Sequence, residues 1–81
     1  MIVVRRQVER YWNGAWGRLA RRDVWLWEQD GRWTVEICAG GLDEGRRHEW
    51  VYESEATARA QLIRCLTAGE DSWVELRSGR S

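Results

Sequence analysis

The chain has 81 residues, of which 43% are hydrophobic and 32% are charged. This length suffices for one domain, and the composition is that of a folded protein rather than a disordered one. Thirteen basic and thirteen acidic residues give a net charge of zero, which excludes the strongly basic balance typical of nucleic-acid-binding domains. A core of this size rarely contributes more than roughly 3–5 kcal/mol, so a partner subunit is one expected source of stability.

The charge is unevenly distributed along the chain. Residues 1–22 carry six arginines against one acid, a charge of +5, and residues 23–81 carry seven arginines against twelve acids, a charge of −5. The basic segment can bind an anionic partner, or it can fold onto its own body or onto a second copy. Every basic residue is arginine, whose planar guanidinium stacks on aromatic rings and binds acids with two parallel hydrogen bonds.

The two cysteines predict a reducing environment. Cys38 and Cys65 are 27 positions apart, and residues 1–4 do not resemble a secretory signal. We therefore expect free thiols and a cytoplasmic location. The longest later apolar run covers only residues 24–27, far short of a membrane span, so we expect no membrane association.

The spacing of apolar residues before Asn13-Gly14 predicts a helix. Four of them recur at i, i+4, i+7 and i+8: Val4, Val8, Tyr11 and Trp12. This periodicity is typical of one helix face. The alternative is a strand that turns at Asn13-Gly14. We favour an additional N-terminal helix within the basic segment.

Asp30-Gly31 is the strongest local signal in the sequence, because this pair supplies the positive φ of a tight hairpin turn. The flanking strands are residues 24–28 and 32–38. A two-residue turn places one set of side chains on a common side, here called the aliphatic face: Val24, Leu26, Glu28, Trp33, Val35 and Ile37. The other side, here called the tryptophan face, carries Trp25 opposite Glu36 and Trp27 opposite Thr34.

A glycine-rich link at residues 39–45 leads to a third predicted strand at residues 46–53. His48, Trp50 and Tyr52 alternate there with Arg47, Glu49 and Val51. Ser54 is a helix N-cap candidate, and Glu55 suits the first turn. An apolar stripe follows at Ala58, Leu62, Cys65 and Leu66, and Gly69 is placed to end the helix. Residues 72–77 predict a short last strand.

The predicted fold class is α+β, with a three- to four-stranded antiparallel meander packed on one main helix. We expect a single domain over residues 1–81, divided into a basic segment (1–22), a three-stranded meander (23–53), a helix (54–69) and a short strand (72–77). The helix stripe and the aliphatic face both need cover, and packing them together provides it. This arrangement leaves Trp25 and Trp27 on the far side.

Residues for catalysis or metal binding are few. His48 is the only histidine, and together with two separated cysteines it falls short of the four ligands of a structural zinc site. The segment Gly40–Gly45 lacks the Lys-Ser/Thr ending of a phosphate-binding loop. We therefore expect no enzyme activity, no metal and no cofactor.

Part of the chain resembles a known family. Residues 31–37 read Gly-Arg-Trp-Thr-Val-Glu-Ile, followed by Gly45-Arg46-Arg47, Trp50 and the run Ala56-Thr57-Ala58-Arg59-Ala60. This pattern resembles the AP2 family of DNA-binding domains, in which a three-stranded antiparallel sheet precedes a packed helix. The resemblance implies that topology, and it implies that Arg32 and Trp33 occupy positions that can contact DNA.

We expect a non-enzymatic binding module with a regulatory role, whose partner is another protein or a second copy. The first alternative is a DNA-binding regulator that uses the exposed sheet face and the basic segment. The second is a protein that sequesters a small ligand in a tryptophan-lined pocket. The candidate binding residues are Trp25, Trp27, Arg32, Thr34 and Glu36 on the sheet, with Arg5, Arg6, Arg18, Arg21 and Arg22 in the basic segment.

Overall fold

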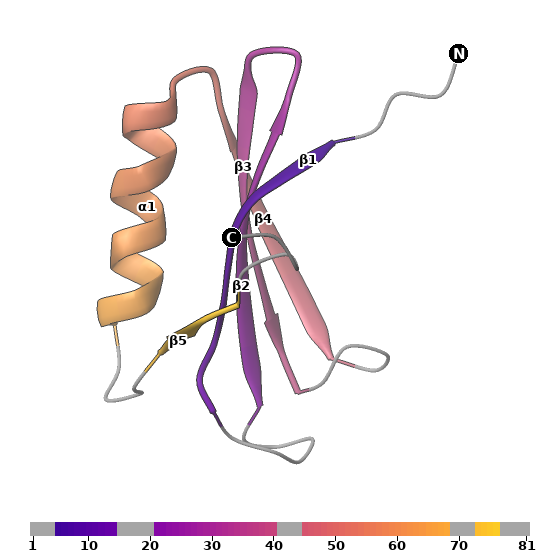
Figure 1. Cartoon of the computed structure of the whole chain (residues 1–81), viewed down its shortest axis with the longest axis vertical. Coiled ribbons are helices and arrows are strands. Elements are labelled where there is room, and N and C mark those ends of the chain that lie inside the picture. The colour runs from indigo at the N-terminus through magenta and orange to yellow at the C-terminus, as the bar shows by residue number, and fades with distance from the viewer. Residues whose placement is uncertain (1–4, 15–20, 41–44, 69–72, 77–81) are drawn as a thin grey trace.

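The computed structural model describes residues 5–14, 21–40, 45–68 and 73–76. They form β1 (Arg6–Trp12), β2 (Arg22–Gln29), β3 (Arg32–Ala39), β4 (Arg46–Tyr52), α1 (Glu55–Thr67) and β5 (Val74–Glu75). The strands build one antiparallel sheet in the order β4-β3-β2-β1-β5. Figure 1 shows α1 against one side of this sheet. The α+β fold with a meander and one packed helix is therefore confirmed, but the sheet has five strands rather than the predicted three to four, because the segment before Asn13 adds a strand.

The hairpin between β2 and β3 has the predicted turn and register. Asp30 and Gly31 have φ values of 51° and 81°, the left-handed conformation of both central residues in a tight turn. Leu26 pairs with Val35 and Trp27 pairs with Thr34. The turn chemistry alone fixes which side chains share a face, because a strand alternates its side chains with a period of two.

The segment before Asn13 is a strand, so the predicted N-terminal helix is wrong. β1 pairs with β2, and its register shifts between Gln7 and Glu9, which leaves Val8 as an extra, bulged residue. Val8 and Tyr11 both pack against the core cluster. Because a bulge inserts one residue into the alternation, two strand residues three positions apart share a face, and this spacing imitates a helix.

β1 is also tied to α1 through side chains. The Arg59 Nη1 group donates to Glu9 Oε2, and the Tyr11 hydroxyl donates to Glu9 Oε1. Burial, reinforced by this bond to Glu9, raises the pKa of Tyr11. The helix therefore holds the first strand as well as the meander.

The predicted helix signals are confirmed where the structure describes them. Ser54 is the N-cap, and its Oγ accepts a 3.2 Å hydrogen bond from the Thr57 backbone N–H. Ala58 and Leu62 are buried, and Cys65 and Leu66 pack against the same cluster. Gly69 lies outside the described residues. The last strand is shorter than predicted, two residues paired with Tyr11 and Trp12 of β1.

The core lies between α1 and the aliphatic face. Its fully buried sheet residues are Val24, Leu26 and Val35, which meet Ala58 and Leu62 of the helix. Partly buried aromatic residues surround this centre: Tyr11, Trp33, Trp50, Tyr52 and Trp73. The tryptophan face contributes no residue to this cluster. Contacts other than the core must therefore account for the burial of its side chains.

We predict that Gly31→Ala lowers the free energy of unfolding by about 1 kcal/mol, because an L-residue with a Cβ is strained at positive φ. No heavy atom lies near the added methyl group, so the loss reports backbone strain alone. Urea denaturation measures it. Gly31→Asn is the matched control, since asparagine tolerates this conformation better than alanine does. Equal losses for both variants would contradict the turn geometry.

Candidate functional site: the tryptophan face

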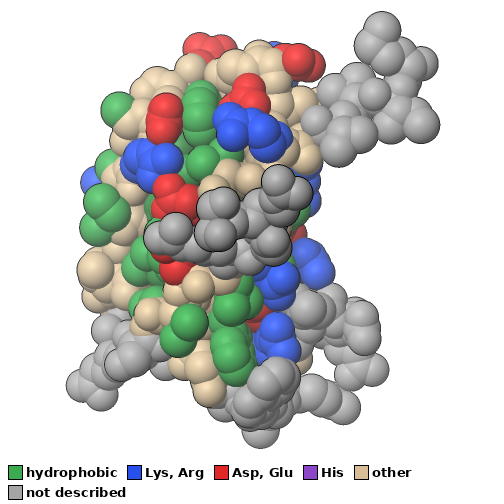
Figure 2. Space-filling model, in the orientation of Figure 1, with side chains coloured by type: hydrophobic (Ala, Val, Ile, Leu, Met, Phe, Trp, Pro, Cys, Tyr) green, Lys and Arg blue, Asp and Glu red, His purple; other side chains and the backbone are tan. Residues whose placement is uncertain are grey.

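No described helix or strand packs on the tryptophan face. The contacts of α1 with the sheet reach β2, β3 and β4 from the aliphatic side. Figure 2, with α1 at the left, shows arginine side chains on the right of the body as well as on the side of α1. Arginine side chains, rather than a second layer of secondary structure in the described chain, lie over the tryptophans of this face.

The two tryptophans of β2 lie beneath arginine side chains. Trp25 has guanidinium carbons of Arg10 and Arg47 at 5.2 and 5.5 Å from its ring centroid. Arg5 lies 4.2 Å over the Trp27 ring. Trp25 is only 6% exposed, so its indole is buried beneath these arginines. Cation–π stacking stabilises such pairs, more so where water is excluded.

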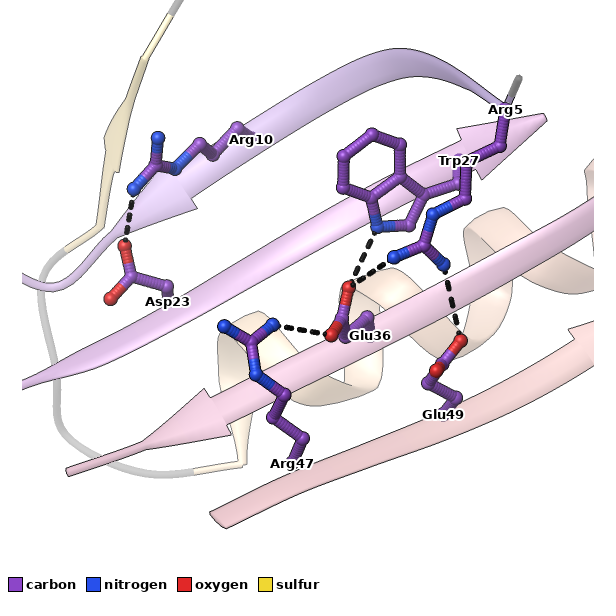
Figure 3. A network of polar contacts seen from close by, with 7 residues as sticks. All are labelled: Arg5, Arg10, Asp23, Trp27, Glu36, Arg47 and Glu49. Atoms are coloured by element: carbon purple, nitrogen blue, oxygen red, sulfur yellow. Dashed lines mark hydrogen bonds and ion pairs between the residues drawn. The ribbon is translucent and has the colours of Figure 1, made fainter. Parts of the chain in front are cut away.

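Glu36 is the centre of the network on this face, although its side chain is only 3% exposed. Its Oε1 accepts hydrogen bonds from Trp27 Nε1 at 2.9 Å and from Arg5 Nη2 at 3.2 Å, and its Oε2 accepts one from Arg47 Nη1 at 2.7 Å. Arg5 also donates to Glu49 at 3.2 Å. Figure 3 shows these side chains converging from the chain before β1 and from β2, β3 and β4.

A second buried acid, Asp23, lies near the opposite end of β2. It is fully buried and accepts hydrogen bonds from Arg10 Nη2 at 3.0 Å and from Arg21 Nε at 2.9 Å. Burial acts to raise the pKa of Asp23, but the hydrogen bonds from Arg21 and Arg10 outweigh it and leave the pKa below its ordinary value. Arg21 also lies over the Trp12 ring, with 5.5 Å to the centroid.

A shallow hollow of about 470 Å³ lies on this face at the end of the β2–β3 hairpin. Its described lining residues are Gln29, Asp30, Arg32, Thr34 and Val51. No tryptophan is among them. Arg32 and Val51 are exposed, so this end of the tryptophan face, unlike Trp25, is open to a partner.

The structure brings some of the predicted binding residues together and separates others. Trp25, Trp27, Glu36 and Arg5 form one cluster, Arg32 and Thr34 line the hollow, and Arg21 binds Asp23. Arg6 is exposed and pairs with Glu28 at 3.4 Å. The Arg22 backbone N–H donates to Asn13 Oδ1. Arg18 lies outside the described residues.

Sequence reasoning missed four residues of this network as site residues: Arg10, Asp23, Arg47 and Glu49. The signal for Arg47 and Glu49 was present, because the predicted alternation of the third strand put them on one face. Arg10 could be found only after the first segment was assigned as a strand opposite Trp25.

No described group of histidine, cysteine and acidic residues could hold a metal ion. His48 is exposed and its ring meets Trp50 edge-on, with centroids 4.3 Å apart. Cys38 is buried and Cys65 is half-buried. Burial raises the pKa of each thiol, which disfavours the reactive thiolate. The helix of the described chain is too short and too polar to cross a bilayer.

The chain matches no family model, no curated protein and no solved structure. Of the two residues that the AP2 resemblance assigns to DNA-contacting positions, Arg32 is exposed at the hollow and Trp33 packs against the core cluster.

We predict that acid weakens the fold in part through Asp23. A carboxylate with a lowered pKa in the folded state contributes stability that is present above the unfolded pKa and is lost as pH falls through the folded one. Because the ordinary value is 3.8, the loss should occur below about pH 4. Asp23→Asn should lower stability by about 2 kcal/mol at pH 7 and flatten this acid dependence.

Urea denaturation between pH 7 and pH 2 provides the measurement. Glu55→Gln is the control, because Glu55 forms an exposed ion pair with Arg59 one helical turn away, and such pairs contribute only about 0.2–0.5 kcal/mol. An Asp23→Asn variant as stable at pH 7 and as acid-sensitive as the wild type would contradict the role assigned to the buried carboxylate.

Proposed function

We propose that this domain is a non-enzymatic protein-interaction module with a regulatory role, and that the tryptophan face is its recognition surface. The partner is another protein or a second copy of the chain. The observation that supports the proposal is a sheet face without a covering helix or strand in the described chain, on which paired arginine and acid side chains are already ordered.

The order of these side chains reduces the entropic cost of binding. Arg5 and Arg47 are 36% and 45% exposed, yet each is held by Glu36 and stacks on an indole ring. Immobilising a free arginine on association costs about 0.5–1.5 kcal/mol, and here much of that cost is met during folding. Arginine and tryptophan are also the residue types enriched at the energetic centres of interfaces.

The charge balance of the face favours a protein over a nucleic acid. Its described cations are Arg5, Arg10, Arg21, Arg32 and Arg47, and its described anions are Asp23, Asp30, Glu36 and Glu49. The two sets nearly cancel. A polyphosphate backbone needs an excess of unneutralised cations, whereas a protein surface can complement both signs.

DNA is the second candidate, supported by the guanidinium groups of Arg5, Arg32 and Arg47 on one side of a sheet. The two candidates differ in salt dependence. Binding through phosphates weakens steeply between 50 and 200 mM salt. We expect no mobility shift of random duplex DNA at micromolar protein; a salt-sensitive shift would replace the protein proposal by the DNA one.

We predict that Arg32→Glu with Thr34→Glu weakens partner binding at least roughly tenfold, the effect of about 1.4 kcal/mol. Both changes lie in the hollow. Ile63→Glu with Arg64→Glu is the control, since it makes the same charge change at exposed positions of α1. Crosslinked capture, with mass spectrometry of the bound protein, compares the variants. Equal capture by all three chains, or no protein bound by any of them, would contradict the proposal.

A further inference from the structure

β4 forms one edge of the sheet, and no described strand pairs with its outer side. The strand is seven residues long, contains no proline and pairs with β3 without a register shift. Alternate backbone N–H and C=O groups of such an edge point away from the sheet and can pair with another strand. The edge is therefore a regular template, and its side chains decide which strand it accepts.

The ion-pair network of the tryptophan face reaches this edge. Arg47 binds Glu36, Glu36 binds Arg5, and Arg5 binds Glu49, so charges alternate in sign along the series. Arg47 and Glu49 of this series are two positions apart on β4 and have side chains 45% and 47% exposed. Figure 3 shows both on the same side of the sheet as Glu36.

We propose that a second copy of this chain pairs antiparallel with β4, with His48 opposite His48 of the second copy. This names the partner of the module and so rests on the proposed function. Residues directly opposite in an antiparallel pair share a face, and in this register Arg47 of each copy lies opposite Glu49 of the other. A guanidinium carries five N–H donors, so Arg47 can bind Glu36 and the second copy's glutamate together.

The pairing joins the two series of charges into one ring. Each copy contributes Arg5, Arg47, Glu36 and Glu49, and every member then has a neighbour of opposite sign on both sides. The two tryptophan faces become one continuous surface, because a two-fold axis perpendicular to the joined sheet keeps both α1 helices on the other side. The interface is isologous, as in most homodimers.

The neighbouring registers lack this complementarity. The two tryptophan faces stay on the same side of the joined sheet only in registers that place odd-numbered residues of one β4 opposite odd-numbered residues of the other. With Glu49 opposite itself, two carboxylates meet at the axis. With Trp50 opposite itself, Glu49 meets Val51. Opposite charges across a strand pair stabilise it and like charges destabilise it, so the charges on β4 select the register centred on His48.

Charge exchange tests the pairing. Sedimentation equilibrium should give the wild type a mass approaching twice the 9.6 kDa of one chain. Arg47→Glu places two acids opposite each other and Glu49→Arg places two arginines opposite each other, so each variant alone should self-associate roughly tenfold more weakly or worse. An equimolar mixture should form the heterodimer, because both cross-strand pairs are then of opposite sign.

Site-directed crosslinking tests the register, and it remains informative even if the Arg47→Glu variant does not fold. In a chain with Cys38→Ala and Cys65→Ala, His48→Cys should form an intermolecular disulfide under mild oxidation. Opposed Cα atoms in an antiparallel pair lie about 4.5–5.5 Å apart, within disulfide range. Arg46→Cys is the control: residue 46 lies opposite residue 50, so its two copies are separated by about four residue rises, roughly 13 Å.

The outcomes separate this inference from the proposed function. A wild type that stays monomeric at millimolar concentration, or crosslinking of Arg46→Cys as efficient as that of His48→Cys, would overturn the β4 pairing. Capture of a different protein through the hollow would then leave the proposed function standing. A dimer that His48→Cys crosslinks and that the charge-exchanged mixture restores would support both.

Discussion

The buried carboxylate of Glu36 is the constraint on which the tryptophan face depends. A charge that is 3% exposed is costly unless hydrogen bonds satisfy it, and Glu36 meets this need with donors from three other parts of the chain. Arg5 is ordered before β1, Trp27 is fixed by its indole N–H, and Arg47 is drawn over Trp25. One acid in β3 therefore fixes three side chains of this face.

The composition of the chain suits this arrangement. The sequence has seven tryptophans and no lysine, and only a planar guanidinium can stack on an indole while donating in its own plane to a carboxylate. Arg5 does both, over Trp27 and toward Glu36. The layer of arginines buries Trp25 without a second layer of secondary structure among the described residues, and the described helix covers the core on the other side of the sheet.

Local signals sufficed for the hairpin, the helix and the assignment of side chains to two faces, because Asp30-Gly31 and Ser54 act within a few residues. The assignment of β1 failed because the bulge at Val8 imitates helical spacing, and only pairing with β2 distinguishes the two. The ion pairs that join Glu36 to Arg5 and Asp23 to Arg10 connect residues far apart in sequence. No periodicity reports such contacts, so the network could not be predicted from the sequence alone.

The position of the network explains why the edge and the face act as one surface. Exposed ion pairs contribute little on their own, since water competes for both partners, and this applies to the Arg5–Glu49 end of the series. A strand that pairs with β4 removes water from just that end and satisfies edge groups of the backbone at the same time. These charges add little to the stability of one chain, but they determine which partner strand binds and in which register. Specifying a partner or a register is the best-attested role of buried polar pairs.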